Sequence, residues 1–565
     1  MHATKLKTEK RVLLAGVFGP FGVDDQYGRK ENVMELFHNQ VTREQGLASF
    51  RFQHRSFGLY FLAENIPGDV TVLDFPSKDQ FKKEIRKGYD IVGISFIAPN
   101  FVKAREMARL VRQYSPDTEI ILGGHGAAIE GVDELIDCDH VVKGEGIRWL
   151  RTHLGADPCA PMVHPVLPSA ELNMLHGIPV PGVTSSLLVP GVGCVNGCSF
   201  CCTSHFFQKE YTPFISTGKA LYETCVHIAD SRGTDEFFVM DENFLKNRER
   251  ALELLAEMEA KERYFEFQIF SSAEAILAFG LDNLVRLGVT FIWLGVESSS
   301  EVGNFAKNKG VNAVELVREL RSRGIMVLAS GILFMEHHTP ANIDKDIDFM
   351  ISLEADFVQF MQLIPLPTTA LYLDFKKRGL IRHDVPFEEW HGQHKLNWKH
   401  PHFSSEAASS WLKAAFRREY VMNCCSLYRV NQSSLMGYKR LEQMGQLDKC
   451  LQARKDALGL RARSWLPGLS AIIRHPVNRS EREKALALKR ECEQSFPPTV
   501  RSRAEAVGAR LAARIWKIRL ALKGDSIQPA TIVTHYPAEG RSVSPVISAP
   551  LEESAFASDV RIQVG

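Results

Sequence analysis

Gly193–Thr203 reads GCVNGCSFCCT and spaces three cysteines as C-x3-C-x2-C: Cys194, Cys198 and Cys201. Three thiolates on one short loop can hold three corners of a 4Fe–4S cluster, because cysteine sulfur is the usual ligand of such clusters. The fourth iron then lacks a protein ligand and is open to a small molecule. Gly193 and Gly197 let the loop curl so that all three sulfur atoms point inward.

A zinc knuckle or three buried cysteines is the alternative reading of this loop. Zinc sites usually supply four protein ligands, often as paired C-x2-C units. The chain has no second pair at a suitable distance, so the spacing favours an iron–sulfur cluster. Cys202 is the odd thiol, and we expect a buried neighbour there rather than a ligand.

The cysteine loop resembles the signature of the radical S-adenosylmethionine (SAM) superfamily. The resemblance implies that the open iron binds the amino and carboxylate groups of SAM. Electron transfer would then cleave SAM to methionine and a 5'-deoxyadenosyl radical. It also implies that Phe200 packs near the adenine of SAM, and that an electron donor such as flavodoxin or ferredoxin serves the protein.

The 565 residues are enough for about two or three domains with ample core. The net charge of +1 is too small to attract nucleic acid to the chain as a whole, and the sequence has no basic accessory domain. We therefore expect no nucleic-acid substrate. Eleven cysteines with irregular spacing, without a signal-peptide pattern, indicate a reducing, cytoplasmic setting. No apolar run approaches the roughly 18 residues that span a bilayer.

Residues 11–150 alternate short β-branched runs with amphipathic segments, which predicts a doubly wound parallel sheet of the Rossmann-like type. Its predicted strands are Val12–Phe18, Val70–Phe75, Asp90–Ile97, Glu119–Gly124 and His140–Lys143. Such sheets bind ligands at the carboxyl ends of their strands.

This pattern resembles the cobalamin-binding domain that precedes many radical SAM domains. The resemblance implies that Ser95, Gly123 and Gly124 line the slot for the nucleotide tail of cobalamin, and Gly144–Gly146 matches the turn that closes that domain. One element is missing: the family's Asp-x-His-x-x-Gly loop, whose His coordinates cobalt from below. Gly22–Gly28 reads GVDDQYG, without a His. The alternative is a domain that has lost its cofactor and serves as a scaffold or substrate platform.

Residues 151–183 are predicted to be a linker, and 184–379 a partial (βα)6 TIM-like barrel. The predicted barrel strands are Thr184–Val189, Glu236–Met240, Phe265–Phe270, Thr290–Leu294, Met326–Leu333 and Phe357–Leu363. Barrel chemistry lies on the loops after the strands, and the cysteine loop follows the first of them.

Other strand ends carry polar residues in an order that resembles cobalamin-type radical SAM members. The resemblance implies four contacts with SAM: Asp241, Glu242, Ser271 and Glu297. Lys309-Gly310 matches the Lys-Gly that follows the Val-Glu-Ser run in those relatives.

Two later loops depart from the family pattern, so the substrate cannot be carried over. Phe334–Pro340 replaces a Gly-x-Pro-Gly-Glu-like turn, and Pro365–Thr369 lacks the usual Gly. Glu336, His337 and His338 have the chemistry of general acids and bases, but a polar loop tip is the favoured reading. No catalytic acid or base is identified.

Residues 380–524 are predicted to be mainly helical, with a polar cover over the barrel mouth at Glu388–Ser405. The 509–523 helix is basic and amphipathic, with one apolar face: Leu511, Ile515, Ile518 and Leu522. It can lie on an anionic membrane surface, although docking on its own domain is favoured. Residues 525–565 are predicted to be a disordered tail.

The leading hypothesis is therefore a radical SAM enzyme that uses cobalamin and transfers a methyl group to an unreactive carbon of a small-molecule, lipid or peptide substrate. One alternative is a cobalamin-independent or non-methylating radical SAM enzyme that rearranges rings or oxidises. Another is an iron- or oxygen-sensing metal-binding protein. The ordered strand-end residues argue against a sensor, which has no need of a SAM shell.

Overall fold

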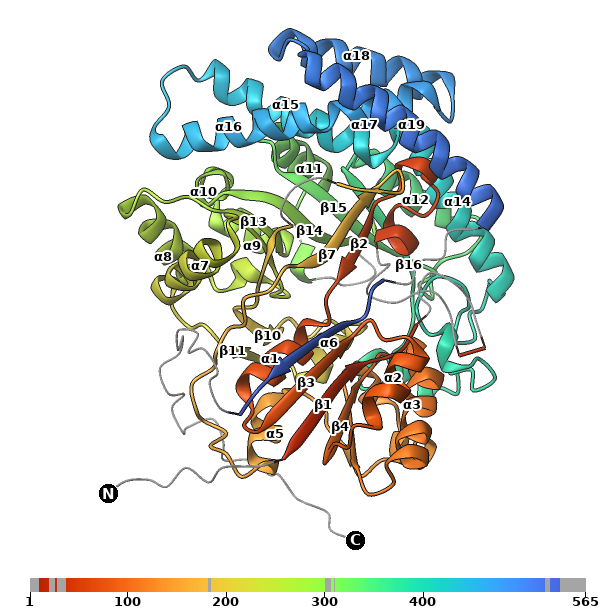
Figure 1. The fold of residues 1–565 in the computed structure, drawn as a ribbon. Coiled ribbons are helices and arrows are strands. Elements are labelled where there is room, and N and C mark those ends of the chain that lie inside the picture. The colour runs from red at the N-terminus through yellow and green to blue at the C-terminus, as the bar shows by residue number, and fades with distance from the viewer. Residues whose placement is uncertain are drawn as a thin grey trace.

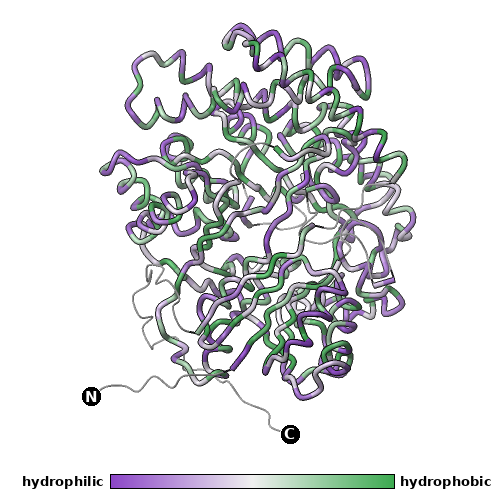
Figure 2. The backbone as a smooth tube through the Cα atoms, viewed as in Figure 1, coloured by the Kyte–Doolittle hydropathy of each residue, from purple (hydrophilic) through white to green (hydrophobic). Residues whose placement is uncertain are grey.

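The computed structural model describes residues 10–19, 26–27, 37–180, 184–299, 306–308, 310–523 and 529–538. Three regions stack in Figure 1: an amino-terminal sheet at the bottom, a second sheet in the middle and a layer of helices at the top. Hydrophobic segments follow the strands of both sheets, whereas the outer helices alternate in hydropathy (Figure 2).

The amino-terminal sheet has the strand order β17-β3-β1-β4-β5-β6. Its parallel strands are β1 (Arg11–Gly16), β3 (Asp69–Asp74), β4 (Ile91–Ser95), β5 (Glu119–Gly123) and β6 (His140–Val141). Its larger helices are α1 (Phe57–Asn65), α2 (Lys78–Ile85), α3 (Phe101–Tyr114) and α5 (Gly146–His153). Val12 and Leu14 share a core with α1 and α5, whereas Leu13 belongs to the core of α2 and α3. Because both faces are covered, the predicted doubly wound sheet is confirmed.

The tail prediction does not hold at Ile532–Tyr536. This segment forms β17 and pairs antiparallel with β3, with Val533 opposite Leu73. The short apolar alternation of IVTHY becomes a strand because β3 offers it an unpaired edge. Residues 525–528 and 539–565 lie outside the described residues.

The central sheet has the parallel order β16-β15-β14-β13-β12-β9, which confirms six βα units in an open barrel. Its strands are β9 (Ser186–Leu188), β12 (Glu236–Val239), β13 (Glu266–Phe270), β14 (Val289–Glu297), β15 (Met326–Leu333) and β16 (Phe357–Gln362). Its helices are α7 (Gly218–Arg232), α8 (Arg248–Ala260), α9 (Ala273–Phe279), α10 (Leu281–Leu287), α11 (Ala313–Ser322), α12 (Ile343–Ser352) and α13 (Ala370–Lys377). The cysteine loop joins β10 (Gly191–Gly193), paired with β11 (Tyr211–Pro213), to α6 (Cys202–Phe206).

The predicted linker 151–183 contains two strands. β7 (Ala170–Leu175) and β8 (Ile178–Pro179) form an antiparallel sheet with β2 (Arg51–His54). The sequence concealed them because the partner strand lies more than a hundred residues earlier in the chain. Residues 181–183 are not described.

The carboxyl-terminal helices cover one end of the barrel (Figure 1). They are α14 (Ser405–Asn423), α15 (Ser426–Gln443), α16 (Lys449–Ser464), α17 (Leu466–Arg474), α18 (Arg479–Ser495) and α19 (Val500–Lys523). No helix in the described part of the chain is long and apolar enough to cross a membrane.

The last helix, α19, docks through a face that the sequence did not indicate. Ala513 and Trp516 are buried, and the ring of Trp516 lies where a Cβ at Gly177 would be, 2.1 Å away. Leu511 and Ile515 of the predicted apolar face are exposed instead. Gly177 leaves room for the Trp516 ring, so α19 docks through Trp516 and Ala513 and leaves the apolar stripe outside.

Candidate functional site

The cysteine loop owes its curl to glycine and to one serine. Gly193 has a φ of 91°, and a Cβ there would lie 2.2 Å from the carbonyl oxygen of Glu210. The Ser204 hydroxyl donates to the carbonyl oxygen of Cys194 at 2.6 Å and accepts from the amide of Gly197 at 3.0 Å. Gly193 therefore tolerates no side chain, and Ser204 holds the two ends of the loop together.

The three predicted ligands are half-buried free thiols. Burial raises the pKa of Cys194, Cys198 and Cys201, to about 11 for Cys201, and Lys307 partly offsets this at Cys198. Thiols that are costly to ionise alone are stable as thiolates when a metal replaces the proton. The loop therefore fits a 4Fe–4S cluster with three protein ligands. Cys202 starts α6, and burial raises its pKa to about 12.

Asp241 and Glu242 follow β12 and have different surroundings. Asp241 is buried, and its Oδ2 accepts hydrogen bonds from Arg250 and the Tyr211 hydroxyl, both at 2.7 Å. Glu242 is solvent-accessible, yet the protein around it and then Asp241 raise its pKa to about 7. Its exposed side chain is free to meet a ligand, whereas that of Asp241 is already bonded on the inside. Glu242 is therefore the better placed of the two to meet SAM, and Asp241 holds the strand end.

The ends of β12 and β13 are locked together by a buried polar network. Ser271 donates to Oδ1 of Asn243 at 3.1 Å, and the Asn243 amide donates to Oγ of Ser272 at 2.8 Å. Ser271 is thus engaged in positioning its neighbours, and its predicted contact with SAM stays a prediction. Asn243 directly follows Asp241 and Glu242 in the sequence, but it is not among the predicted SAM contacts.

Glu297 ends β14 and is paired with a lysine that the sequence analysis missed. Its Oε1 accepts from Lys307 Nζ at 2.5 Å, and Glu297 has a φ of 70°. The pair lies over Gly295, where a Cβ would approach the lysine nitrogen to 2.4 Å. The amide of Asn308 donates to the carbonyl oxygen of Gly295 at 3.0 Å, so the segment closes the end of the strand.

Lys307 stands two residues before the predicted Lys309-Gly310, and Lys309 lies outside the described residues. Because Lys307 neutralises Glu297 and also influences Cys198, it links the end of β14 to the cysteine loop. The Lys309-Gly310 motif pointed to this segment of the chain, but the lysine that pairs with Glu297 lies two residues before it.

The carboxyl ends of β4 and β5, with Ser95, Gly123 and Gly124, form the predicted cobalamin edge, and this edge is open at Gly123. Ser95 and Gly123 pair across β4 and β5, and no described atom lies within 4 Å of a Cβ built on Gly123. Gly124 has a φ of 78°, and a Cβ there would lie 2.6 Å from the carbonyl oxygen of Phe96. An open strand end bounded by small residues fits a narrow ligand tail, so these residues fit cobalamin. Most of the Gly22–Gly28 loop lies outside the described residues.

The cobalamin edge meets the cysteine loop at His125. Its ring stacks on Phe206 of α6 with centroids 4.6 Å apart, and Phe207 approaches edge-on at 6.4 Å. Nε2 of His125 is buried and has no hydrogen-bond partner among the described residues, and burial lowers its pKa to about 4. A neutral imidazole therefore separates the edge of the first domain from the helix that follows the cluster cysteines.

The segment after the barrel, predicted as a cover over the barrel mouth at Glu388–Ser405, contacts the end of β16, and Phe387 just before it contacts the first domain. Phe387 contacts Phe101 of the first domain with ring centroids 5.0 Å apart. Farther along, the amide of Gln362 at the end of β16 donates to the carbonyl oxygen of Gly392 at 2.9 Å, and the Trp398 indole donates to Leu363 at 3.0 Å. The cover thus bridges both domains.

Two of the three polar residues in the loop after β15 are engaged in contacts within the protein, and the third, His337, is half-buried beside His338 with ring centroids 4.4 Å apart. His338 is buried, accepts from the Met335 amide through Nδ1 and contacts Asp346 through Nε2, both at 3.0 Å. Asp346 in turn accepts from Ser298 at 2.6 Å. Glu336 pairs with Arg378 at the surface. The favoured reading of a polar loop tip therefore fits Glu336 but not His338, which is buried and supports the loop through Asp346.

Comparisons with known proteins agree with this geometry. The B12 binding domain matches residues 46–151, and the Radical SAM superfamily matches residues 188–350. An uncharacterized methyltransferase of Pyrococcus horikoshii is 22% identical over 406 residues, covering 64% of this chain and 87% of that protein. The bacteriochlorophyllide d C-8(2)-methyltransferase of Chlorobaculum tepidum is 25% identical over 338 residues, covering 55% and 72%.

One solved structure shares the fold over most of the chain. The radical SAM methyltransferase TsrM from Kitasatospora setae, with cobalamin and a 4Fe–4S cluster bound, gives a TM-score of 0.50 at 14% identity. The match covers 80% of this chain and 100% of that chain.

The chain belongs to the radical SAM superfamily, and within it to the members that carry a B12-binding domain. Its cofactors are a 4Fe–4S cluster, SAM and cobalamin. As a radical SAM enzyme it acts on a small molecule and needs a reductant.

Proposed function

We propose that the protein is a cobalamin-dependent C-methyltransferase that moves a methyl group from SAM to an unreactive carbon of a small, apolar molecule. The observation that carries the proposal is the contact between the two cofactor edges, where His125 stacks on Phe206. The methyltransferase names of the relatives support the same reaction.

When bound, the cluster supplies the electron for SAM cleavage and cobalamin supplies a carrier for the methyl group. The chain's own residues hold and enclose these groups. Cys194, Cys198 and Cys201 are the cluster ligands in this proposal. Glu242 holds the ammonium group of SAM, since its side chain is exposed at the end of β12 while that of Asp241 is buried. The cover from Phe387 to Trp398 excludes water from the junction.

The products of SAM separate this proposal from its alternatives. Protein loaded with cluster and hydroxocobalamin should release S-adenosylhomocysteine, which is what remains when SAM gives up its methyl group. It should also release 5'-deoxyadenosine, with a chemical reductant or with flavodoxin or ferredoxin as the electron donor. A protein that makes 5'-deoxyadenosine alone, with or without cobalamin, would be a non-methylating enzyme. Neither product would favour a sensor.

The exposed stripe of α19 supports an apolar substrate that is taken from a membrane surface. Four of its residues are more than half exposed: Leu511, Ile515, Ile518 and Leu522. Basic groups flank the stripe along a hollow with α17: Arg474, Arg510, Arg514 and Lys517. An apolar stripe between cations matches an anionic lipid surface, where apolar side chains enter the interface and the cations meet the headgroups.

Vesicle sedimentation tests this contact. The full chain should pellet with vesicles of phosphatidylglycerol and phosphatidylcholine, less with phosphatidylcholine alone, and less at high salt. Ile515→Ser with Ile518→Ser should reduce vesicle binding at least about tenfold. Two isoleucine side chains that leave water for the membrane interface contribute more than about 1.4 kcal/mol to the binding free energy. Leu460→Ser, an exposed apolar residue on α16, is the matched control. Equal binding of the double variant, or self-association through the stripe without lipid, would overturn the membrane contact.

A further inference from the structure

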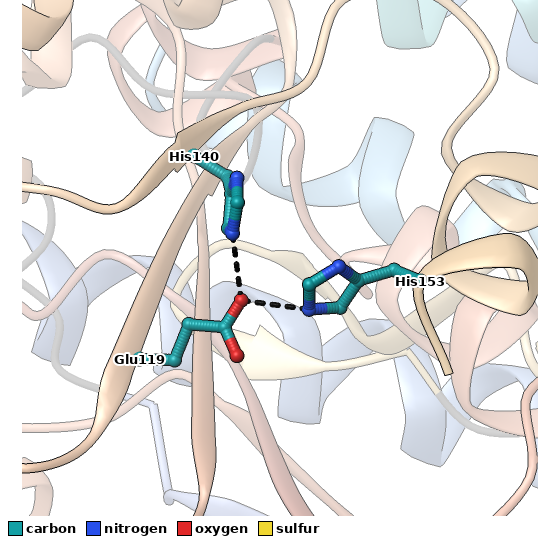
Figure 3. Close-up of side chains that lie close together, drawn as sticks. All are labelled: Glu119, His140 and His153. Atoms are coloured by element: carbon teal, nitrogen blue, oxygen red, sulfur yellow. Dashed lines mark ion pairs between the residues drawn. The ribbon is translucent and has the colours of Figure 1, made fainter. Parts of the chain in front are cut away.

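Three side chains from separate elements converge in the B12-binding domain, away from both cofactor edges. Glu119 opens β5, His140 opens β6 and His153 ends α5 (Figure 3). The Nε2 atoms of His140 and His153 lie 2.8 Å and 2.7 Å from the same carboxylate oxygen, Oε1 of Glu119. Glu119 stands at the amino end of its strand, whereas Gly123 stands at the carboxyl end that the cobalamin edge uses.

By distance these contacts are ion pairs, which need protonated imidazoles, and they do not have hydrogen-bond geometry. Oε1 of Glu119 and Nε2 of His153 are both shielded from solvent, and neither has a hydrogen-bond partner among the described residues. Polar atoms in that state are costly unless a further group satisfies them. The nearest cation, Lys10 Nζ, lies 3.8 Å from the other oxygen, Oε2, and so leaves Oε1 to the two imidazoles.

The surroundings fix the imidazole rings. Trp149 lies one turn before His153 on α5, and its indole stacks on the His153 ring at 4.9 Å and 12°. The same indole contacts His140 at 5.4 Å. Asp139 anchors the start of β6, because it accepts from the Ile120 amide at 2.7 Å and from Arg112 at 2.9 Å. The donor atoms are therefore held near one another before any ligand arrives.

We propose that Glu119, His140 and His153 bind a divalent transition-metal ion of the zinc type, with water completing the coordination. Two imidazoles and one carboxylate are an established ligand set for Zn²⁺, and the His140 side chain, 38% exposed, puts one side of the cluster at the surface, where water can reach a bound ion. Imidazole nitrogen disfavours Mg²⁺ and Ca²⁺, which take oxygen ligands. The ion ties α5 and β6 to the start of β5.

Zinc uptake by the holoenzyme tests the site. The protein carries its cluster and cobalamin, so that the cluster cysteines are occupied, and is dialysed against excess chelator and then against Zn²⁺. Elemental analysis should find one more zinc per chain in the wild type than in His140→Ala with His153→Ala. A matched control removes two exposed histidines elsewhere, His383→Ala with His402→Ala, and should keep the ion.

Thermal unfolding gives a second, independent reading. An ion that binds only the folded chain raises the unfolding midpoint as its concentration rises. Zn²⁺ should raise the midpoint of the wild type and the control, but not that of Glu119→Gln, which keeps the size of the side chain and so guards against a folding defect in the double variant. Equal zinc content in all proteins, or the same midpoint shift in Glu119→Gln, would overturn the site.

Discussion

The two ligand edges of this protein are built in opposite ways. The barrel edge presents side chains: three thiols, the Glu242 carboxylate and the Lys307–Glu297 pair. The edge of the B12-binding domain has glycines instead. Gly123 leaves open space beside the strand, and Gly124 lets the backbone pass close to Phe96. Both edges are carboxyl ends of parallel strands. The barrel edge offers ligand side chains, whereas the edge of the first sheet offers the space that its glycines leave free.

This difference predicts how each edge fails. A site built from ligand atoms is lost when one atom is removed, because nothing else can replace a thiolate. A site built from space is lost when an atom is added, and the fold itself need not suffer. The variants below test this contrast.

Removing a cluster thiol should have the largest effect. Cys198→Ala should lose the cluster and with it all formation of 5'-deoxyadenosine, because only two ligands remain on the loop. Iron and sulfide analysis and product detection measure both. Cys202→Ala is the neighbouring control and should keep cluster and cleavage. If Cys202→Ala lost the cluster and Cys198→Ala kept it, the ligand assignment would be wrong.

Adding a side chain to the open edge should remove cobalamin and spare the cluster. Gly123→Leu directs its side chain into space that no described atom fills, so the protein should fold while its affinity for cobalamin falls at least about tenfold. Gly58→Leu, another site without a described atom within 4 Å, is the control. Absorbance of retained cobalamin after gel filtration reports the result, and full retention by Gly123→Leu would place the ligand elsewhere.

Replacing each of the adjacent carboxylates, Asp241 and Glu242, by its amide should separate a loss of fold stability from a loss of SAM binding. Asp241→Asn leaves buried Arg250 without its charged partner and should cost about 3–5 kcal/mol of stability, seen as a lower unfolding midpoint. Glu242→Gln should leave the midpoint of the cofactor-free protein nearly unchanged near pH 5 and weaken SAM binding instead. Similar midpoints for both variants would contradict this division.

The pH dependence follows from the pKa of Glu242, which desolvation by the surrounding protein and then the charge of Asp241 raise from 4.5 to about 7. Below about pH 7 the carboxyl is protonated and cannot pair with the ammonium of SAM. Because the folded pKa is the higher one, Glu242 also makes the empty fold less stable as pH rises from about 4.5 to about 7. The KM for SAM should therefore fall as pH rises through 7 in the wild type and stay flat in Glu242→Gln. A parallel slope in both proteins would show that another group titrates.

The smallest effect should come from the edge strand of the first sheet. A chain that ends at residue 528 lacks β17 and exposes the edge of β3, so amides near Leu73 should exchange faster and cobalamin affinity should change little. A chain that ends at residue 538 keeps β17 and is the control. Unchanged exchange in β3 would mean that the pairing contributes no protection.

The sequence revealed most of the fold because its signals are local. Short β-branched runs and amphipathic helices follow from neighbouring residues, so both parallel sheets were predicted strand by strand. β7 and β17 were missed because each becomes a strand only through a distant partner: Arg51–His54 for one and Asp69–Asp74 for the other. Lys307 was missed because its pairing with Glu297 is a tertiary contact.

The chain alone thus gave the order of the two parallel-sheet domains and predicted the three cluster cysteines and the glycine-lined strand ends, since spacing and periodicity are properties of a linear sequence. Only the tertiary structure decided which of two adjacent carboxylates is open, which face of α19 docks, and that Glu119, His140 and His153 meet. These depend on which distant segments pack together, and packing is chosen by the whole core rather than by any one stretch of residues.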